Sequence, residues 1–240
     1  MRDYRALLAA RSRHAEDELN AATSRGAKQY VIIGAGLDTY AYRNHDTNLR
    51  VFEVDHPATQ AWKRTQLDTA GIAIPPSLAF VPTEFEERTL PSALESAGFR
   101  AGETSFFSWF GVSPYPSAQA TIETLAFIAS LPTGSGVVFD YADRRSWFDP
   151  ALDSVEETAM ERLASRVSDD GESIQLLLDS RALDRLLKSV GFNEVEDLGP
   201  AEIDKRYFNN RADGLRVTPG SVHLVSAQVR RQDEKPSKIK

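Results

Sequence analysis

The sequence predicts a three-layer α/β/α sandwich built on a doubly wound, mostly parallel sheet of about seven strands, with an antiparallel hairpin at its end. Three observations predict this fold. Short apolar strands alternate with segments of helical periodicity, which calls for parallel pairing through crossover helices. A glycine-rich turn directly follows the first strand, and acidic residues follow the next two strands. Turns and acids of this kind line the crevice at the carboxyl ends of the strands in such folds.

Composition indicates one domain. The chain has 240 residues, of which 41% are hydrophobic and 26% charged, so it supplies one substantial core, expected over residues 1–230. The net charge of -7 argues against a nucleic-acid partner, and the absence of cysteine excludes disulfides and thiolate chemistry. No apolar run reaches membrane-spanning length, and the first residues lack the apolar core of a signal peptide. We therefore expect a cytoplasmic protein without a membrane partner.

The first predicted element is an amphipathic helix over residues 6–24, followed by a buried strand over residues 29–33. Arg11 and Arg13 interleave with the apolar positions of the helix, and an ordinary solvated face accounts for them equally well. After the strand, Gly34 and Gly36 remove two side chains where the backbone turns sharply, so a ligand can approach the main chain. A nucleotide-like cofactor is the natural occupant, and a tight turn without function is the alternative.

An acid, Asp38, stands before Thr39 at the place where the dinucleotide fingerprint needs its third small residue. A carboxylate there suits a cationic or hydroxyl-bearing ligand better than a pyrophosphate. Asp38 and Thr39 are also residue types that begin helices.

The second predicted strand covers residues 50–54, and Asp55 follows it about 20 residues after the glycine turn, where an acid binds ribose hydroxyls in crevices of this kind. A helix cap in front of Pro57 is the alternative interpretation of Asp55. The third predicted strand covers residues 78–81. Glu84 and Phe85 beyond it suit a purine ring, although a loop with one buried aromatic explains them equally well.

The second half of the sequence continues the alternation. The predicted elements are a helix at 91–97, a strand at 104–109, a helix at 117–131, a strand at 136–141, a helix at 181–190, an edge strand at 193–198 and a last strand at 221–229. Between them, residues 142–180 form a charged helical insertion that serves either as a lid or as plain surface decoration. Residues 231–240 are predicted to be a disordered tail.

A stretch at residues 206–216 is too polar for a core and too aromatic for a plain loop. Its Arg206, Tyr207 and Arg211 are predicted to bind the substrate, and two arginines favour an anionic one. The alternative is a salt-bridged surface loop that uses Asp204 and Asp213.

Several segments together resemble a known family. They are residues 10–17 (ARSRHAED), 34–39 (GAGLDT), 52–57 (FEVDHP), 80–85 (FVPTEF), 191–192 (GF), and 206–208 with 211–214 (RYF and RADG). These short segments are spread over nearly the whole chain. With them the sequence resembles the class I S-adenosylmethionine-dependent methyltransferases, and more narrowly the leucine carboxyl methyltransferase-like family, whose bacterial branch has many members without an assigned substrate.

The resemblance implies S-adenosyl-L-methionine as the cofactor and gives each candidate residue a role. Arg11 would bind the cofactor carboxylate, Gly34 and Gly36 would line its methionyl part, Asp55 would bind the ribose, and Glu84 with Phe85 would hold the adenine. Each role has a physical basis, because an arginine forms a bidentate pair with a carboxylate and a carboxylate accepts bonds from hydroxyl donors.

The sequence departs from the family pattern in three ways. Family members often carry Asp at the place of Glu84, and an acid in the segment where this chain has Phe110. Without that acid, Asp38 or a backbone carbonyl is left to bind the cofactor ammonium group. Family members also carry more residues before the first helix, and these would help to cover the active site.

The function expected is an O-methyltransferase (EC 2.1.1 class) that acts on a small-molecule carboxylate or hydroxyl acceptor. An ionised carboxylate needs no general base, whereas a hydroxyl acceptor would make His45 or Tyr115 the first catalytic candidates. The four histidines lack metal-ligand spacing, so no metal site is expected, and each of them (His14, His45, His56 and His223) is predicted to lie on the surface or to cap a helix.

Two further classes of function stay open at this point. One is a non-catalytic cofactor-binding or interaction protein of the same fold, which the short amino terminus favours. The other is a nicotinamide-dependent oxidoreductase, because a glycine turn after a strand is shared with that class.

Overall fold

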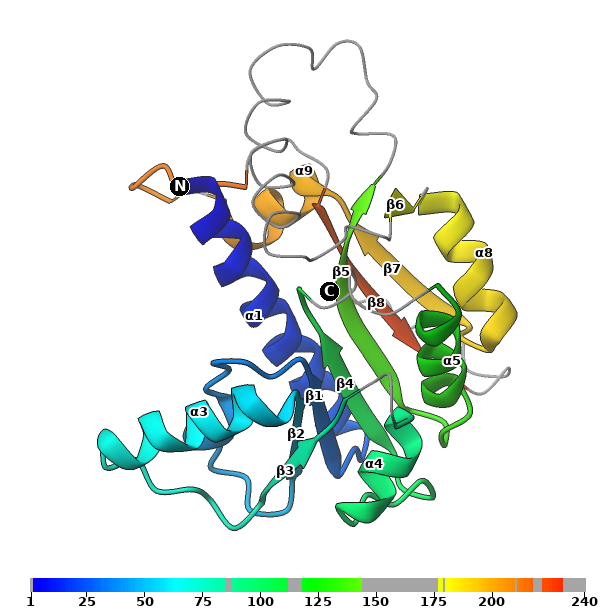
Figure 1. Ribbon diagram of the computed structural model, residues 1–240. Helices are drawn as coiled ribbons and strands as arrows, with labels where there is room; N and C mark the ends of the chain where they lie inside the picture. The colour runs from blue at the N-terminus through cyan, green and yellow to red at the C-terminus, as the bar shows by residue number, and fades with distance from the viewer. Residues whose placement is uncertain are drawn as a thin grey trace.

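The computed structural model describes residues 2–84, 88–111, 118–143, 177–178, 180–209, 211–217 and 222–230 (Figure 1). Its sheet has the strand order β3-β2-β1-β4-β5-β8-β7, and a short strand, β6, pairs with β5 off this path. All pairings are parallel except those that β8 makes with β5 and β7. This is the predicted doubly wound fold with its antiparallel hairpin, and β7 is the predicted edge strand.

The strands are β1 (Gln29–Ile33), β2 (Arg50–Asp55), β3 (Leu78–Pro82), β4 (Ser105–Trp109), β5 (Gly136–Asp143), β6 (Leu177–Leu178), β7 (Glu194–Leu198) and β8 (Val222–Gln228). The helices are α1 (Arg2–Ser24), α2 (Tyr40–Arg43), α3 (Pro57–Thr69), α4 (Leu90–Ser96), α5 (Ala118–Ala129), α8 (Ser180–Val190), α9 (Pro200–Ile203) and the π-helix η2 (Asp204–Phe208). Most of these bounds lie within two residues of the predicted ones.

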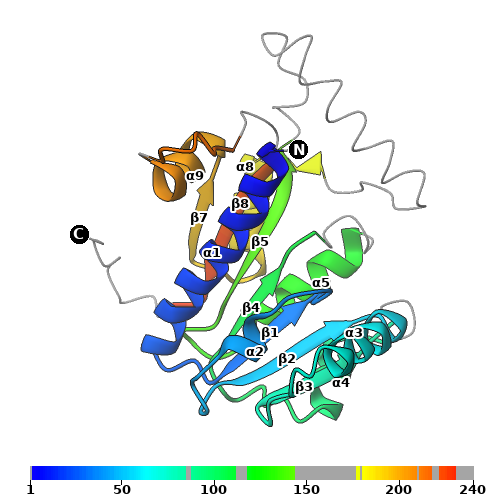
Figure 2. The ribbon, with the colours of Figure 1, turned by 90° about the vertical axis from the view of Figure 1, so that its left-hand side faces the viewer.

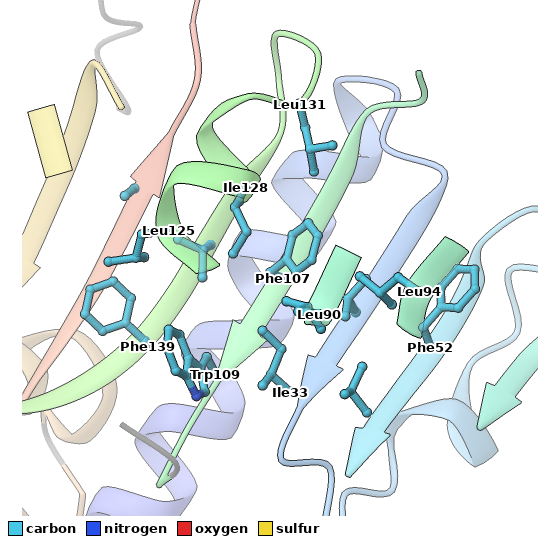
Figure 3. Close-up of a cluster of buried hydrophobic side chains, with 14 of the residues drawn as sticks. Ile33, Phe52, Leu90, Leu94, Phe107, Trp109, Leu125, Ile128, Leu131 and Phe139 are labelled. Carbon is cyan, nitrogen blue, oxygen red and sulfur yellow. The ribbon is translucent and has the colours of Figure 1, made fainter. Parts of the chain in front are cut away.

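Helices α4, α5 and α8 cover one face of the sheet, where the larger core cluster lies (Figure 3). Alternate strand residues such as Ile33, Phe52 and Phe107 point into this cluster and are almost completely buried. Full burial of a side chain of this size contributes about 1.5–3 kcal/mol. The apolar side chains of β1 and β4 on this face therefore pack against helices. Because helices also cover the other face of the sheet, the side chains on that face must be apolar as well.

Helix α1 lies along the opposite face, in front of β5 and β8 in Figure 2. Its Ala15, Leu19 and Ala22 pack with the other alternate strand residues, including Tyr30 and Phe106. The amino-terminal half of α1 joins a third cluster with α9, η2 and β8. The predicted amphipathic helix is thus confirmed as one whose apolar side faces the sheet.

One predicted segment is partly helical, and two others lie mostly or wholly outside the described residues. The stretch at residues 206–216, for which the alternative was a salt-bridged surface loop, begins inside η2, so part of it is helical. Most of the predicted insertion at 142–180, and the predicted disordered tail at 231–240, lie outside the described residues. Within the described ranges, no helix has the length and apolar character needed to cross a bilayer.

The strand register defines a row of residues at the carboxyl edge of the sheet. One row across five adjacent strands consists of Ile33, Val54, Val81, Trp109 and Phe139. The residues that follow them form the next row outward: Gly34, Asp55, Pro82, Phe110 and Asp140. This outer row brings the glycine turn and two acids to one edge of the sheet.

Candidate functional site

The glycine turn crosses from β1 to the end of β2. The amides of Gly34 and Ala35 both donate to the carbonyl of Val54, over 2.9 and 3.1 Å. Gly34 and Gly36 have φ angles of 68° and 43°, a region in which residues with a side chain are strained. The sequence needs glycine here because of the backbone conformation, since a Cβ on Gly36 would meet no atom closer than 3.9 Å.

Asp55 lies at the base of this turn. Its Oδ2 accepts from the Gly36 amide over 2.5 Å, and its Oδ1 accepts from the His56 amide over 2.7 Å. The expectation that Asp55 could cap the following helix is wrong, because Asp55 ends β2 and the cap is His56, whose Nδ1 accepts from the Ala58 amide. Each oxygen has lone-pair capacity beyond its one amide donor. Asp55 therefore fixes the turn while a carboxylate remains at the crevice.

Glu84 follows β3 on the same side of the sheet. Its Oε1 lies 3.6 Å from His56 Nε2, and its side chain is partly exposed. Glu84 therefore stands beside His56, the residue that follows Asp55. Its predicted partner, Phe85, lies outside the described residues.

Asp38 has two contacts that hold the far end of the turn. Its Oδ1 accepts from the Tyr40 amide over 2.7 Å, and its main-chain carbonyl accepts from Lys63 Nζ over 2.8 Å. Burial raises the pKa of the Asp38 carboxyl above its ordinary value, although the Tyr40 amide and the Lys63 ammonium oppose the shift. Thr39 precedes α2 but its side chain makes no cap hydrogen bond.

Beneath the turn, Lys63 also forms an ion pair with Glu53, with 2.7 Å between Nζ and Oε2. Both side chains are almost fully buried. Burial raises the pKa of Glu53 to about 7, against the opposing effect of the Lys63 charge. Sequence reasoning did not anticipate this pair.

On the other side of the turn, Arg11 of α1 reaches Asp140 of β5. Nη1 of Arg11 lies 3.3 Å from Oδ2 of Asp140, and the Gly111 amide donates to Oδ1 over 2.8 Å. A Cβ on Gly111 would lie 3.4 Å from Arg11 Nη1, an ordinary van der Waals contact, so glycine is favoured here by its φ angle of 66° and not by lack of space. The guanidinium also lies 5.8 Å from the ring centroid of Phe110. The solvated-face alternative for Arg11 is wrong, since Arg11 faces the carboxyl edge of the sheet; it does hold for Arg13, which is exposed and pairs with Asp17.

Sequence reasoning missed Asp140. Burial raises the pKa of this carboxyl, while Arg11 and the Gly111 amide favour its ionised form. The available signal was a single acid inside the otherwise apolar strand of residues 136–141, since an acid in a buried strand needs a partner.

The predicted substrate residues form two ion pairs and one hydrogen bond. Arg206 bonds Glu196 through both Nη atoms, over 2.9 and 2.6 Å, and Arg211 bonds Asp213 in the same two-pronged way. The Arg211 pair is the one that the salt-bridged alternative named. Asp204 does not follow that alternative, because it accepts from the Val217 amide.

Tyr207, the third predicted substrate residue, bonds through its hydroxyl to His14 Nδ1 over 2.9 Å. The prediction that His14 lies on the surface or caps a helix is wrong, because it lies within α1 and is completely buried. Burial, with a smaller contribution from the nearby Arg206 charge, lowers the pKa of His14 to about 4. The imidazole ring of His14 is therefore neutral at pH 7.

The remaining histidines and base candidates lie elsewhere. His45 is exposed in the loop after α2, and His56 is the predicted type of helix cap. His223 is partly exposed on β8 and lies 2.8 Å from Asp197. Tyr115 lies outside the described residues. Within the parts of the chain that the structure describes, no group of three or more His, Asp or Glu side chains is arranged to hold a metal ion.

Comparison with known proteins gives this site a family. The family model described as leucine carboxyl methyltransferase matches residues 1–129. The Bacillus subtilis protein named "Putative S-adenosyl-L-methionine-dependent methyltransferase YktD" is 36% identical over 223 residues, which are 91% of this chain and 71% of YktD. A similarly named protein of Frankia alni is 34% identical over 62% of this chain. The chain spans only 53% of the Frankia protein and 45% of a Mycobacterium marinum relative.

Solved structures show the same fold at low sequence identity. A methyltransferase candidate from Thermobifida fusca has a TM-score of 0.64 and 15% identity, over 95% of this chain and 82% of its own. A DUF574 family protein from Streptomyces avermitilis has a TM-score of 0.61, also at 15% identity, over 95% of this chain and 87% of its own. The chain thus belongs to the leucine carboxyl methyltransferase family of S-adenosylmethionine-dependent methyltransferases, and its cofactor is S-adenosyl-L-methionine.

Proposed function

We propose that this chain transfers the methyl group of S-adenosylmethionine to an oxygen atom of a small carboxylate or hydroxyl compound. The observation that carries the proposal is the outer row at the carboxyl edge of the sheet. There Asp55 holds the glycine turn on one side and Arg11 reaches the same edge from α1 on the other. A hydrogen-bond acceptor for hydroxyl groups and a donor for a carboxylate at one edge of the sheet would suit the two ends of the cofactor, which supports the proposal.

The residues present fit the cofactor chemically. The turn of Gly34 and Gly36 presents main chain without side chains, which suits the methionyl part. Arg11 supplies a guanidinium for the cofactor carboxylate, and Asp55 supplies an acceptor for the ribose hydroxyls. We assign the adenine to Glu84 and Phe85, since a carboxylate accepts from its amino group.

S-adenosylmethionine supplies a methyl carbon that bonds to the acceptor oxygen while its bond to sulfur breaks and the electron pair stays on sulfur. The protein's part is to align the acceptor and to exclude water. A carboxylate is already ionised at neutral pH, so it requires no general base. For a hydroxyl acceptor, we propose His45 or Tyr115 as the group that takes the proton.

The acceptor site itself remains a proposal. Arg206, Tyr207 and Arg211 are our candidates for an anionic acceptor because they bring two guanidinium groups and a phenol together along one stretch. Binding there would compete with the pairs to Glu196 and Asp213. A substrate carboxylate that only replaces Glu196 or Asp213 as the partner of an arginine gains little binding free energy. The substrate must therefore also contact neighbouring groups.

A tritiated-methyl transfer assay against a library of small carboxylic acids and phenols tests the proposal. We expect one chemical class to accept label, with S-adenosylhomocysteine released in equal amount. Calorimetry with S-adenosylhomocysteine and NAD serves as the companion measurement. Cofactor binding without transfer to any acceptor would support the non-catalytic alternative, and binding of NAD alone would overturn the proposed function.

A further inference from the structure

Arg11 and Asp140 place two opposite charges side by side at the carboxyl edge of the sheet, two strands away from the strand that the glycine turn follows. The distance of 3.3 Å between Arg11 Nη1 and Asp140 Oδ2 is longer than the 2.7–2.9 Å typical of a charge-assisted bond. The Arg206–Glu196 pair, in contrast, is bidentate with distances of 2.9 and 2.6 Å. The Arg11 pair therefore leaves hydrogen-bonding capacity on its guanidinium for another anion.

A pair of this kind is complementary to a zwitterion. In an α-amino acid the ammonium nitrogen and the carboxylate carbon are about 2.5 Å apart, by ordinary bond lengths and angles. A group that binds the carboxylate must therefore have the partner of the ammonium within a few ångströms. Asp140 Oδ2 meets this requirement because it lies 3.3 Å from Arg11.

We propose that Asp140 binds the ammonium group of the cofactor's amino-acid end while Arg11 binds its carboxylate. The inference rests on the proposed cofactor site. It also accounts for Phe110, which stands where an acid is frequent in the family. Asp140 occupies the neighbouring position of the same row, on β5, so the carboxylate is supplied from the next strand.

The geometry of Asp140 suits an ion-binding role. The Gly111 amide fixes its Oδ1, which leaves the carboxylate in one orientation. The carboxylate is almost completely buried, so an ammonium partner interacts with it in a medium of low dielectric constant, where the attraction is stronger than in water. The free-energy cost of desolvating Asp140 arises on folding, so ligand binding does not add it again.

Asp38 is the competing candidate, since it was the acid expected to replace the missing one. Its Oδ1 is bonded to the Tyr40 amide and its carbonyl to Lys63, so its contacts lie at the α2 and α3 side of the turn. Asp140 is the acid that contacts Arg11. An amino acid whose carboxylate binds Arg11 therefore presents its ammonium group to Asp140.

Isothermal titration calorimetry with S-adenosylhomocysteine and its deaminated analogue tests this assignment. We expect the wild type to prefer the amine-bearing ligand by roughly 10- to 100-fold. Asp140→Asn, which keeps an acceptor for the Gly111 amide, should lose that preference while its affinity for the deaminated analogue changes little. Asp184→Asn, in an exposed pair with Lys188, is the matched control and should keep the preference.

Several outcomes would overturn the inference. One is equal affinity of the wild type for the two ligands, and another is a full preference retained by Asp140→Asn. Asp38→Asn keeps the inference falsifiable if Asp140→Asn does not fold: we expect this variant to retain the preference, and its loss would assign the ammonium to Asp38. A wild type that binds neither ligand would refute the proposed cofactor site itself, which separates the two failures.

Discussion

Lys63 Nζ donates both to Glu53 Oε2, over 2.7 Å, and to the main-chain carbonyl of Asp38, over 2.8 Å. One buried ammonium group thereby joins β2, α3 and the end of the glycine turn. It also lies 5.4 Å from the ring centroid of Tyr42. The conformation of the turn thus depends on a buried charge that contacts it from α3.

We predict that Lys63→Met lowers the free energy of unfolding by about 3–5 kcal/mol, because it leaves the carboxylate of Glu53 buried without its partner. The Asp38 carbonyl also loses its donor, so the affinity for S-adenosylhomocysteine should fall. Urea denaturation and calorimetry measure the two effects. Lys188→Met, which removes an exposed partner of Asp184, is the control and should cost less than about 1 kcal/mol. Equal effects of the two variants would contradict a structural role for the buried pair.

The sequence could predict the fold because its signals are local. The run at Gln29–Ile33, the two glycines after it and the acid at Asp55 each have a short-range pattern, and the strand register then brings them together. It could not predict the Arg11–Asp140 contact, which joins residues 129 positions apart. The hydrophobic periodicity of a sequence does not indicate which helix or loop lies next to the end of which strand.

His14 illustrates the same limit. It occupies a position on the sheet side of α1, where a histidine and a small apolar residue fit the helical pattern equally well. Its partner Tyr207 lies 193 positions away and on a π-helix, a rare element that gives little local signal. For the same reason no helix was predicted at residues 206–208, which lie in η2.

A second prediction concerns the pH dependence of stability at Glu53. Burial raises its folded-state pKa to about 7, above the ordinary value of 4.5, and Lys63 opposes the shift while Asp38 and Asp55 add to it. The contribution of this raised pKa to stability is present below the unfolded-state pKa and is lost as pH rises through about 7. Wild type should therefore lose on the order of 2 kcal/mol relative to Glu53→Gln between pH 5 and pH 8. Urea midpoints of both proteins at the two pH values give the difference, and a constant difference would refute the raised pKa.

The third prediction concerns His14, where stability should fall as the pH is lowered, the opposite direction to that at Glu53. Burial holds the pKa of His14 near 4, below its ordinary value of 6.5, so the unfolded chain binds a proton at this position more readily than the folded one. Stability from the neutral ring is present above pH 6.5 and is lost as pH falls toward 4. We expect wild type to lose about 2 kcal/mol relative to His14→Gln between pH 7 and pH 4.5. The exposed His45→Gln is the control, and its stability difference from wild type should not change with pH over this range.

The last prediction separates the two tasks of Asp55. Its carboxylate accepts from the amides of Gly36 and His56, so Asp55→Ala removes the support of the turn as well as the proposed acceptor of the ribose hydroxyls. We predict a loss of about 1–3 kcal/mol in the binding of S-adenosylhomocysteine, with an unchanged circular dichroism spectrum.

A ligand without the ribose 2′-hydroxyl distinguishes these tasks. If Asp55 bonds the sugar, the 2′-deoxy analogue should already bind wild type more weakly, and Asp55→Ala should affect the analogue less than it affects S-adenosylhomocysteine. If Asp55 only holds the turn, the variant should weaken both ligands by the same factor, because a displaced glycine main chain disturbs the methionyl part that the two ligands share. Calorimetry of the four protein–ligand combinations gives the coupling energy directly, and a value near zero would leave Asp55 with a structural role alone.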